Sequence, residues 1–176
     1  MNLQKLLLTL TAVVIFSGCA VYKIQQTEPL DISARWVILP LLNHSDTPEA
    51  GARASDIVAT LLRSQGIQQL TSYVAIATNN NSLPELNQQK SLTQAISNTR
   101  SQGYRFGVGG SVQEWRYKSG LDGEPAAGIT LTVTDLESGK VVWSASGSRT
   151  GWGRESVSGV AHKLMAKLID GLSLTE

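Results

Sequence analysis

Residues 129–135 read ITLTVTD, and their strict alternation of apolar and polar side chains restricts the possible folds more than any other stretch of the chain. The isoleucine, leucine and valine fall on one face and the three threonines on the other, which is typical of a half-buried strand in an antiparallel sheet. Ser138 and Gly139 then predict a tight turn, followed by a return strand, KVVWSASGSR, over residues 140–149. The chain is therefore expected to build its core against one face of a sheet.

The segments before this hairpin alternate between strand and helix patterns. Residues 35–43, RWVILPLLN, form an unbroken apolar run that indicates a strand buried on both faces. The following helix is expected to have Thr47 as its N-cap and Pro48 in its first position, and to end at Gly66. Residues 67–77 then predict a second strand.

Three further elements complete the expected order. A second helix is predicted over residues 91–103, and the strand-like stretch 104–120 contains three glycines that indicate a bulge or close backbone packing. The last helix should begin near Ser156, because apolar residues then recur at helical spacing. This order predicts an α/β (α+β) fold for a single domain over residues 35–176, with a mixed sheet of about five strands packed with about three helices.

The N-terminus, MNLQKLLLTLTAVVIFSGCA, has the features of a bacterial lipoprotein signal. One lysine precedes an uncharged apolar run that is too short to span a bilayer, and the run ends in FSGC, which resembles a lipobox. Residues 1–18 are therefore expected to be removed as a signal peptide, and Cys19, the only cysteine, to be acylated, for example with palmitate. Ala20 resembles the signal for an outer-membrane destination, and residues 19–34 are expected to form a lipidated tether.

Charge balance and missing motifs narrow the function. Lys5 is the only one of the 15 lysines and arginines that precedes Cys19, so the rest balance the 14 acidic residues, and no binding of nucleic acid is expected. His44 lies in a loop before a helix and His162 lies off the apolar stripe of the last helix. No nucleophile, phosphate-binding or zinc motif occurs. We therefore expect no enzymatic activity, cofactor or metal site.

Three stretches together resemble the PelC family of outer-membrane lipoproteins, which act in the export of the Pel exopolysaccharide. They are RWVILPLLNHSDTPEAGARA, SVQEWRYKSGLDGEPAAG and TDLESGKVVWSASGSRTGWGRES. The likeness covers nearly all of the chain from Arg35 to Leu172 and is weak over residues 71–98. It implies a fold similar to the periplasmic domain of curli-secretion lipoproteins.

The resemblance also implies how such a chain acts. Family members are expected to form a homo-oligomeric ring, a dodecamer, on the periplasmic side of the outer membrane beside a PelB-like export barrel. An electronegative face of the ring would guide the cationic polysaccharide toward the barrel and so support the biofilm matrix. The resemblance implies no catalysis.

Two other classes of function stay open at this point. A periplasm-facing regulatory lipoprotein, which activates a cell-wall synthase or another envelope enzyme, needs a long tether, and the expected tether reaches at most about 50 Å at roughly 3.3 Å per residue. A membrane pore needs hairpins with a lipid-facing apolar band, whereas the hairpin at residues 129–147 has one polar, threonine-bearing face. The short tether favours a domain held close to the outer membrane, and the polar face of the hairpin disfavours the pore.

Two groups of residues are candidates for function. Trp152 lies between two glycines, with Arg149 and Arg154 just outside them, and a tryptophan beside cations suits a membrane interface with anionic head groups. We therefore expect Trp152 to face the inner leaflet of the outer membrane rather than its own core. Asp122 and Glu124 lie in the turn LDGEP, where carboxylates repeated around a ring would concentrate a polycation.

Overall fold

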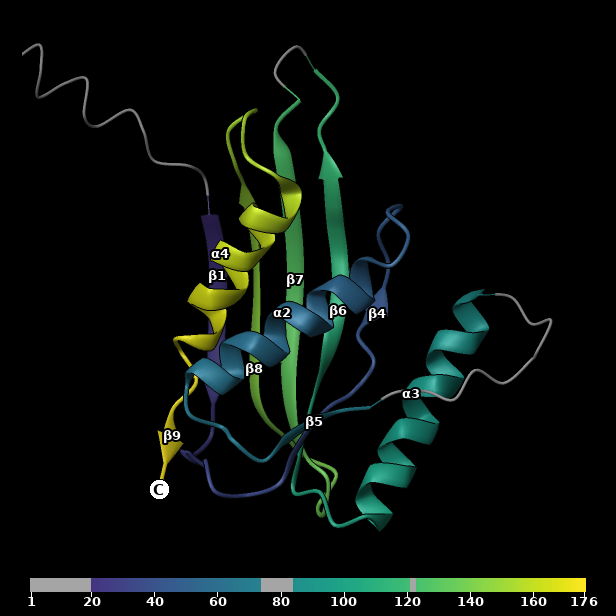
Figure 1. Cartoon of the computed structure of the whole chain (residues 1–176), viewed down its shortest axis with the longest axis vertical. Coiled ribbons are helices and arrows are strands. Elements are labelled where there is room, and N and C mark those ends of the chain that lie inside the picture. Colours follow the sequence, from purple (N-terminus) through teal and green to yellow (C-terminus); the bar gives the residue numbers. More distant parts are fainter. Residues whose placement is uncertain (1–19, 74–83, 121–122) are drawn as a thin grey trace, which may run out of the picture.

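The computed structural model describes residues 20–73, 84–120 and 123–176, and its helices and strands form an α/β fold, as predicted (Figure 1). In chain order the elements are β1 (Ala20–Gln26), β2 (Leu30–Asp31), β3 (Trp36–Ile38), β4 (Leu42–Asn43), α2 (Ala50–Ser64), β5 (Leu70–Ser72), α3 (Pro84–Ser101), β6 (Phe106–Tyr117), β7 (Pro125–Asp135), β8 (Val141–Thr150), α4 (Val157–Ile169) and β9 (Leu174–Thr175). Among these residues the main sheet has seven strands in the order β1-β8-β7-β6-β3-β5, with β4 paired to β6. The two short strands β2 and β9 pair with each other in parallel.

The antiparallel strands β6, β7 and β8 form the predicted meander at the centre of the sheet. Strand β7 alternates as its sequence indicates, since Ile129, Leu131 and Val133 are fully buried while the threonines between them are only half-buried. Gly139 has a φ of 74° in the expected turn between β7 and β8. Because β3 runs parallel to β6, the sheet is mixed, as predicted.

The glycine-rich start of β6 explains the predicted close packing. Gly110 has a φ of 149°, and a Cβ atom there would lie 2.0 Å from the carbonyl oxygen of Thr130 on β7. The register between the two strands also shifts between Val112 and Glu114, which is a bulge. Glycine at position 110 thus lets β6 approach β7 closely.

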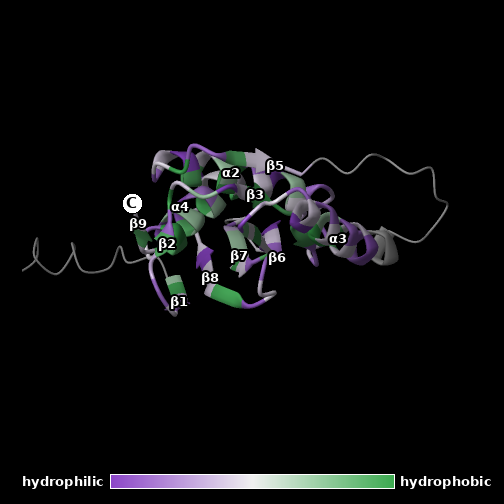
Figure 2. Cartoon of the chain, turned by 90° about the horizontal axis from the view of Figure 1, so that it is seen from below, coloured by the Kyte–Doolittle hydropathy of each residue, from purple (hydrophilic) through white to green (hydrophobic). Residues whose placement is uncertain are grey.

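The helices cover the two faces of the sheet unequally. Helices α2 and α4 lie across one face, where the main core contains Trp36, Trp143, Leu131 and Leu164 (Figure 1). On the other face a small cluster of Val37, Leu39 and Leu136 packs with Ala95 of α3. Figure 2 shows α3 beside β6, while no helix of the described chain lies over β8 and β1 on that side. Part of one sheet face is therefore uncovered.

The start signals of two helices had different outcomes. The side chain of Ser156 accepts a hydrogen bond of 3.0 Å from the backbone N–H of Gly159, so the predicted start of α4 is confirmed. The predicted cap at Thr47 is wrong, because the N-cap of α2 is Glu49, with a φ of 61° and no side-chain cap. The hydroxyl group of Thr47 instead donates to the backbone oxygen of Trp115 on β6.

Two other boundaries differ from those expected. The strand predicted over residues 67–77 is limited to β5 as far as the structure describes it, and residues 74–77 lie outside the described part. Helix α3 begins at Pro84, several residues before the predicted start of the helix over residues 91–103.

The largest difference concerns residues 20–26, which were expected to belong to a flexible tether. They form the edge strand β1, which pairs antiparallel with β8 from Ala20 opposite Arg149 to Gln26 opposite Trp143. Ile24 packs against the main core, and this long-range pairing has no signal in the local sequence. Residues 20–26 are therefore part of the sheet.

Candidate functional site

Most of the predicted site residues lie at one end of the sheet, the end at which β1 begins. We define the loop end of the molecule as Ala20, Tyr117, Lys118, residues 123–125 and residues 149–155. Ala126 pairs with Thr150, and the backbone N–H of Gly151 donates to the oxygen of Pro125 over 2.8 Å, which joins the β6–β7 and β8–α4 connections. In Figure 1 these connections lie at the top of the molecule, where β1 also begins.

The position of Ala20 decides where an acylated Cys19 would be attached. Cys19 itself lies outside the described residues. Ala20 is paired with Arg149 in the last part of β8, three residues before Trp152. Ala20, the first described residue, therefore lies at the loop end.

Trp152 occupies an ordered turn at the loop end, with 57% of its surface exposed. Its backbone N–H donates to a carboxylate oxygen of Glu155 over 3.0 Å, and the backbone N–H of Glu155 donates to the oxygen of Trp152 over 2.8 Å. At Gly151 a Cβ atom would lie 2.4 Å from Cγ2 of Val160, so this glycine permits close packing rather than loop extension. The large ring thus extends from a turn that is tied firmly to α4.

Glu155 connects this turn to α4 through charge. Lys163 forms an ion pair with its carboxylate. The hydrogen bond from Lys163, and after it the one from the Trp152 backbone, hold the pKa of Glu155 below its ordinary value. The carboxylate is therefore ionised at neutral pH, and its contribution to the turn is lost only as pH falls through the lowered pKa.

The two arginines predicted beside Trp152 lie in different environments. Arg154 is exposed in the same turn as Trp152. Arg149 is half-buried on β8, opposite Ala127 on β7, and its Nε atom is buried without a hydrogen-bond partner among the described residues. Its charge also helps to lower the pKa of Glu155. Of the two, Arg154 is therefore the one placed at the surface.

The acidic turn between β6 and β7 lies at the same end. Glu124 is half-buried, and its backbone oxygen accepts a hydrogen bond of 2.7 Å from the N–H of Lys118. Asp122 lies outside the described residues. The structure thus brings Glu124, Trp152, Arg149 and Arg154 to one end of the sheet.

Two residues at this end were not predicted as part of the site. The side chain of Tyr117 is 55% exposed, and the ammonium group of Lys118 donates to the hydroxyl of Thr150 over 2.8 Å. Tyr117 ends the strand that buries Trp115, and the sequence offers no signal that separates these two aromatic residues. Tyr117 is exposed and Trp115 is buried because the strand leaves the core between them.

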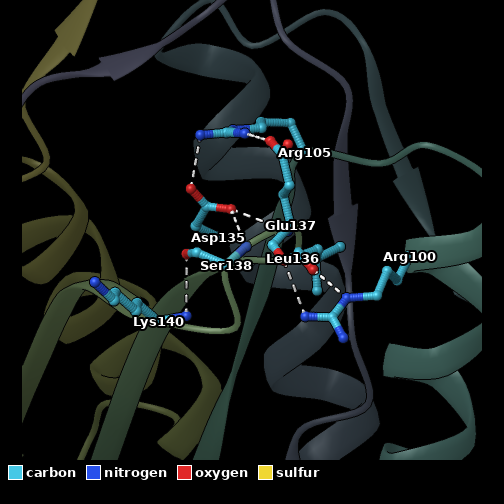
Figure 3. A network of polar contacts seen from close by, with 7 residues as sticks. All are labelled: Arg100, Arg105, Asp135, Leu136, Glu137, Ser138 and Lys140. Atoms are coloured by element: carbon cyan, nitrogen blue, oxygen red, sulfur yellow. Dashed lines mark hydrogen bonds and ion pairs between the residues drawn. The ribbon is translucent and has the colours of Figure 1, made fainter.

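A polar network at the opposite end of the sheet has a structural role (Figure 3). Arg105 contacts Asp135 over 2.7 Å and also Glu137, while Arg100 of α3 donates to the backbone oxygens of Leu136 and Glu137. The second oxygen of Asp135 accepts from the N–H groups of Glu137 and Ser138 over 2.9 and 3.1 Å. These contacts join the β7–β8 turn to β6 and α3 and leave the carboxylate of Asp135 fully engaged.

The histidines and the other metal-ligating side chains are scattered over the described part of the chain. His44 and His162 are both exposed; His44 lies in the loop after β4 and His162 lies on α4. Within residues 20–73, 84–120 and 123–176, no group of three or more metal-ligating side chains comes together. The helices in those ranges are too short or too polar to cross a membrane.

Comparison with known proteins then places the chain among relatives. No protein-family model and no curated protein matches it. Among solved structures, a PelC dodecamer from Paraburkholderia phytofirmans superposes with a TM-score of 0.75 at 34% sequence identity, over 90% of this chain and 100% of that one. The chain belongs to the PelC family. A second PelC dodecamer structure, of a single-substitution variant from the same organism, agrees at the same TM-score and identity over 89% of this chain.

Sequence identity and superposition of the fold both support membership of the PelC family. Lipoprotein GNA1162 from Neisseria meningitidis is a more distant match, with a TM-score of 0.49 at 17% identity over 78% of this chain. The PelC match spans the whole of the solved chain.

Proposed function

We propose that this protein is an outer-membrane lipoprotein that forms a homo-oligomeric ring and guides a cationic exopolysaccharide, Pel, to its export barrel. The observation that supports this most is the match at 34% identity to the full length of a PelC chain solved as a dodecamer. No catalytic step is part of the proposal. The partners are the membrane, a PelB-like barrel, further copies of the chain and the polymer.

The position of β1 supports attachment close to the membrane. An acyl chain on Cys19 would leave the protein directly beside Arg149, because Ala20 is already part of the sheet. Several acyl chains on one residue bind a membrane stably, since each buried methylene contributes about 0.8 kcal/mol. With residues 20–26 held in the sheet, little chain is left to reach across the periplasm, which weighs against the regulatory alternative.

In this arrangement the loop end faces the inner leaflet of the outer membrane. Trp152 and Tyr117 are exposed there, and aromatic rings with a polar atom are favoured at the boundary between lipid and water. Arg154 and Lys118 add positive charge at the same end, which attracts anionic head groups. Repeated around a ring, each subunit would contribute one such contact.

The acidic turn would then lie next to the mouth of the export barrel. Glu124 and Asp122 would raise the local concentration of a polycation through a field summed over all subunits. Exchange of both for their amides is expected to lower export while leaving the fold intact. Normal export by that double variant would remove these two acids from the proposal.

The membrane-facing role of Trp152 can be tested against a matched residue. Val141 has the same exposed fraction, 57%, but lies at the opposite end of β8. In the chain from residue 20 onward, we expect Trp152→Ala to weaken binding to vesicles of phosphatidylethanolamine and phosphatidylglycerol. In the full chain, we expect the same substitution to lower export by cells. Val141→Ala should change neither.

The thermal midpoint separates this role from a structural one. Because Trp152 is exposed, its truncation should shift the midpoint by only a few degrees. A loss of stability near the roughly 3–5 kcal/mol of a buried Trp→Ala change would contradict the assignment, as would vesicle binding equal to that of the unchanged protein.

A further inference from the structure

One face of the sheet is rich in hydroxyl groups and is left uncovered. We call it the hydroxyl face; its members are the outward-facing residues Val21, Lys23, Ser111, Gln113, Thr130, Ser146 and Ser148. They lie on β1, β8, β7 and β6, on the side of the sheet away from α2 and α4 (Figure 2). The face is hollowed by a depression of about 460 Å³ that is lined by several of these residues.

The polar groups in the middle of this face bind one another. The amide of Gln113 donates to the hydroxyl groups of Ser111 and Thr130 over 2.8 and 3.0 Å. The hydroxyl of Thr130 also shares a hydrogen bond of 3.0 Å with that of Ser146 on β8. Polar groups that are already paired cost little to remove from water, so the middle of this face can be buried against another surface at little cost.

The edge of the face has an exposed apolar side chain, and its charges lie around the hydroxyl groups rather than among them. Val21 is 73% exposed on β1, which is the edge strand of the sheet in the described chain. Lys23 lines the depression, and Glu114, which is opposite Gly128 on the same side of the sheet, forms an ion pair with Arg116 over 2.9 Å. The centres of protein–protein interfaces are depleted in charge, and an open sheet edge is a surface that other chains can cover.

We propose that the hydroxyl face is the contact surface for a neighbouring copy of this chain in the ring. This inference rests on the proposed ring, for which the dodecameric PelC relatives are the support. A cyclic ring needs two different surfaces on each subunit, because a head-to-tail contact repeats around the axis. The hydroxyl face supplies one of them.

The direction of the strands explains why this surface faces a neighbour. The strands run from the loop end to the opposite end, so a loop end directed at the membrane turns the hydroxyl face sideways. Lys23, which lines the depression, repels a cationic polymer, and the carboxylate of Glu114 beside it is already paired with Arg116. A second copy therefore fits this face better than the polymer does.

The test measures the mass of the full lipidated chain in detergent by native mass spectrometry. Ser146→Arg places a long cation in the middle of the face, and we expect it to raise the concentration at which the ring dissociates at least tenfold. Ser148→Arg tests the rim of the depression without disturbing a hydrogen bond between side chains, in case Ser146→Arg impairs folding. Thr60→Arg, on the exposed side of α2, is the matched control and should keep the ring.

The outcomes separate this inference from the proposed function. If the unchanged chain is a monomer at all concentrations, the ring itself is wrong and this interface with it. If the unchanged chain forms a ring and both serine variants keep it, only the interface is wrong. Variants that keep the ring but lose binding of chitosan oligosaccharides would assign the face to the polymer and overturn the inference.

Discussion

The two faces of β7 have the same backbone and opposite surroundings. On the side of α2 and α4, Ile129, Leu131 and Val133 have no exposed surface. On the other side Thr130, Thr132 and Thr134 stay half-buried, because α3 covers only the part of that face beside β6 and β3. One face is thus completed within the chain, while the other leaves a paired hydroxyl surface open.

This contrast shows what an alternating pattern determines. Apolar residues at every second position predict which face joins the core, since burial of apolar area stabilises the fold at about 25 cal/mol per Å². The polar face is defined only by exclusion, and its threonines are compatible with water, a helix or another subunit. What covers such a face depends on tertiary and quaternary structure.

The largest effect is expected on the covered face. Leu131→Ala removes a fully buried side chain from the main core, and such a change typically lowers the free energy of unfolding by about 2–5 kcal/mol. The neighbour on the opposite face, Thr132→Ala, should change it by less than about 1 kcal/mol. Urea unfolding at one fixed protein concentration measures both. Equal losses would mean that the open face is as important for stability as the covered one.

A smaller effect is expected where α4 crosses β8. Gly147 lies on the covered face, and a Cβ atom there would lie 2.8 Å from the backbone oxygen of Val21 and 3.1 Å from Cδ1 of Leu164. Gly147→Ala should therefore cost about 1–3 kcal/mol through overpacking. Its neighbour Ser148 is exposed, and Ser148→Ala should be neutral within about 0.5 kcal/mol. A neutral Gly147→Ala would show that α4 can move away from the sheet at little cost.

Much of the covered face could be predicted from the sequence. The alternation in β7, the turn at Gly139 and the start of the last helix near Ser156 are local signals, and the structure confirms each of them. Thr47 has the same kind of local signal, but its hydroxyl binds β6 instead of capping α2. A side chain with two possible partners follows the tertiary contact, which a local pattern does not contain.

The site was predictable to a smaller extent. The exposure of Trp152 agrees with its position between two glycines, although Gly151 serves close packing against Val160. Residues 20–26 show no clean periodicity, because an edge strand held by β8 needs little amphipathic pattern of its own. That one missed strand determines where the acylated end of the chain lies.

The smallest effect is expected within the hydroxyl face, and it connects the two faces to the ring. Thr130→Val removes the hydrogen bonds to Gln113 and Ser146 while keeping the shape of the side chain. In an isolated subunit water can replace these partners, so the loss should be at or below about 1 kcal/mol. In a ring that buries the face, the hydroxyl of Ser146 and one of the two N–H groups of the Gln113 amide would be left unpaired away from water, and the loss should be larger. The comparison is made by unfolding Thr130→Val alone and in the presence of Ser148→Arg, which is expected to open the ring. An equal loss in both backgrounds would show that water reaches the hydroxyl face in the assembled protein. That face would then be as open in the ring as it is in the single subunit.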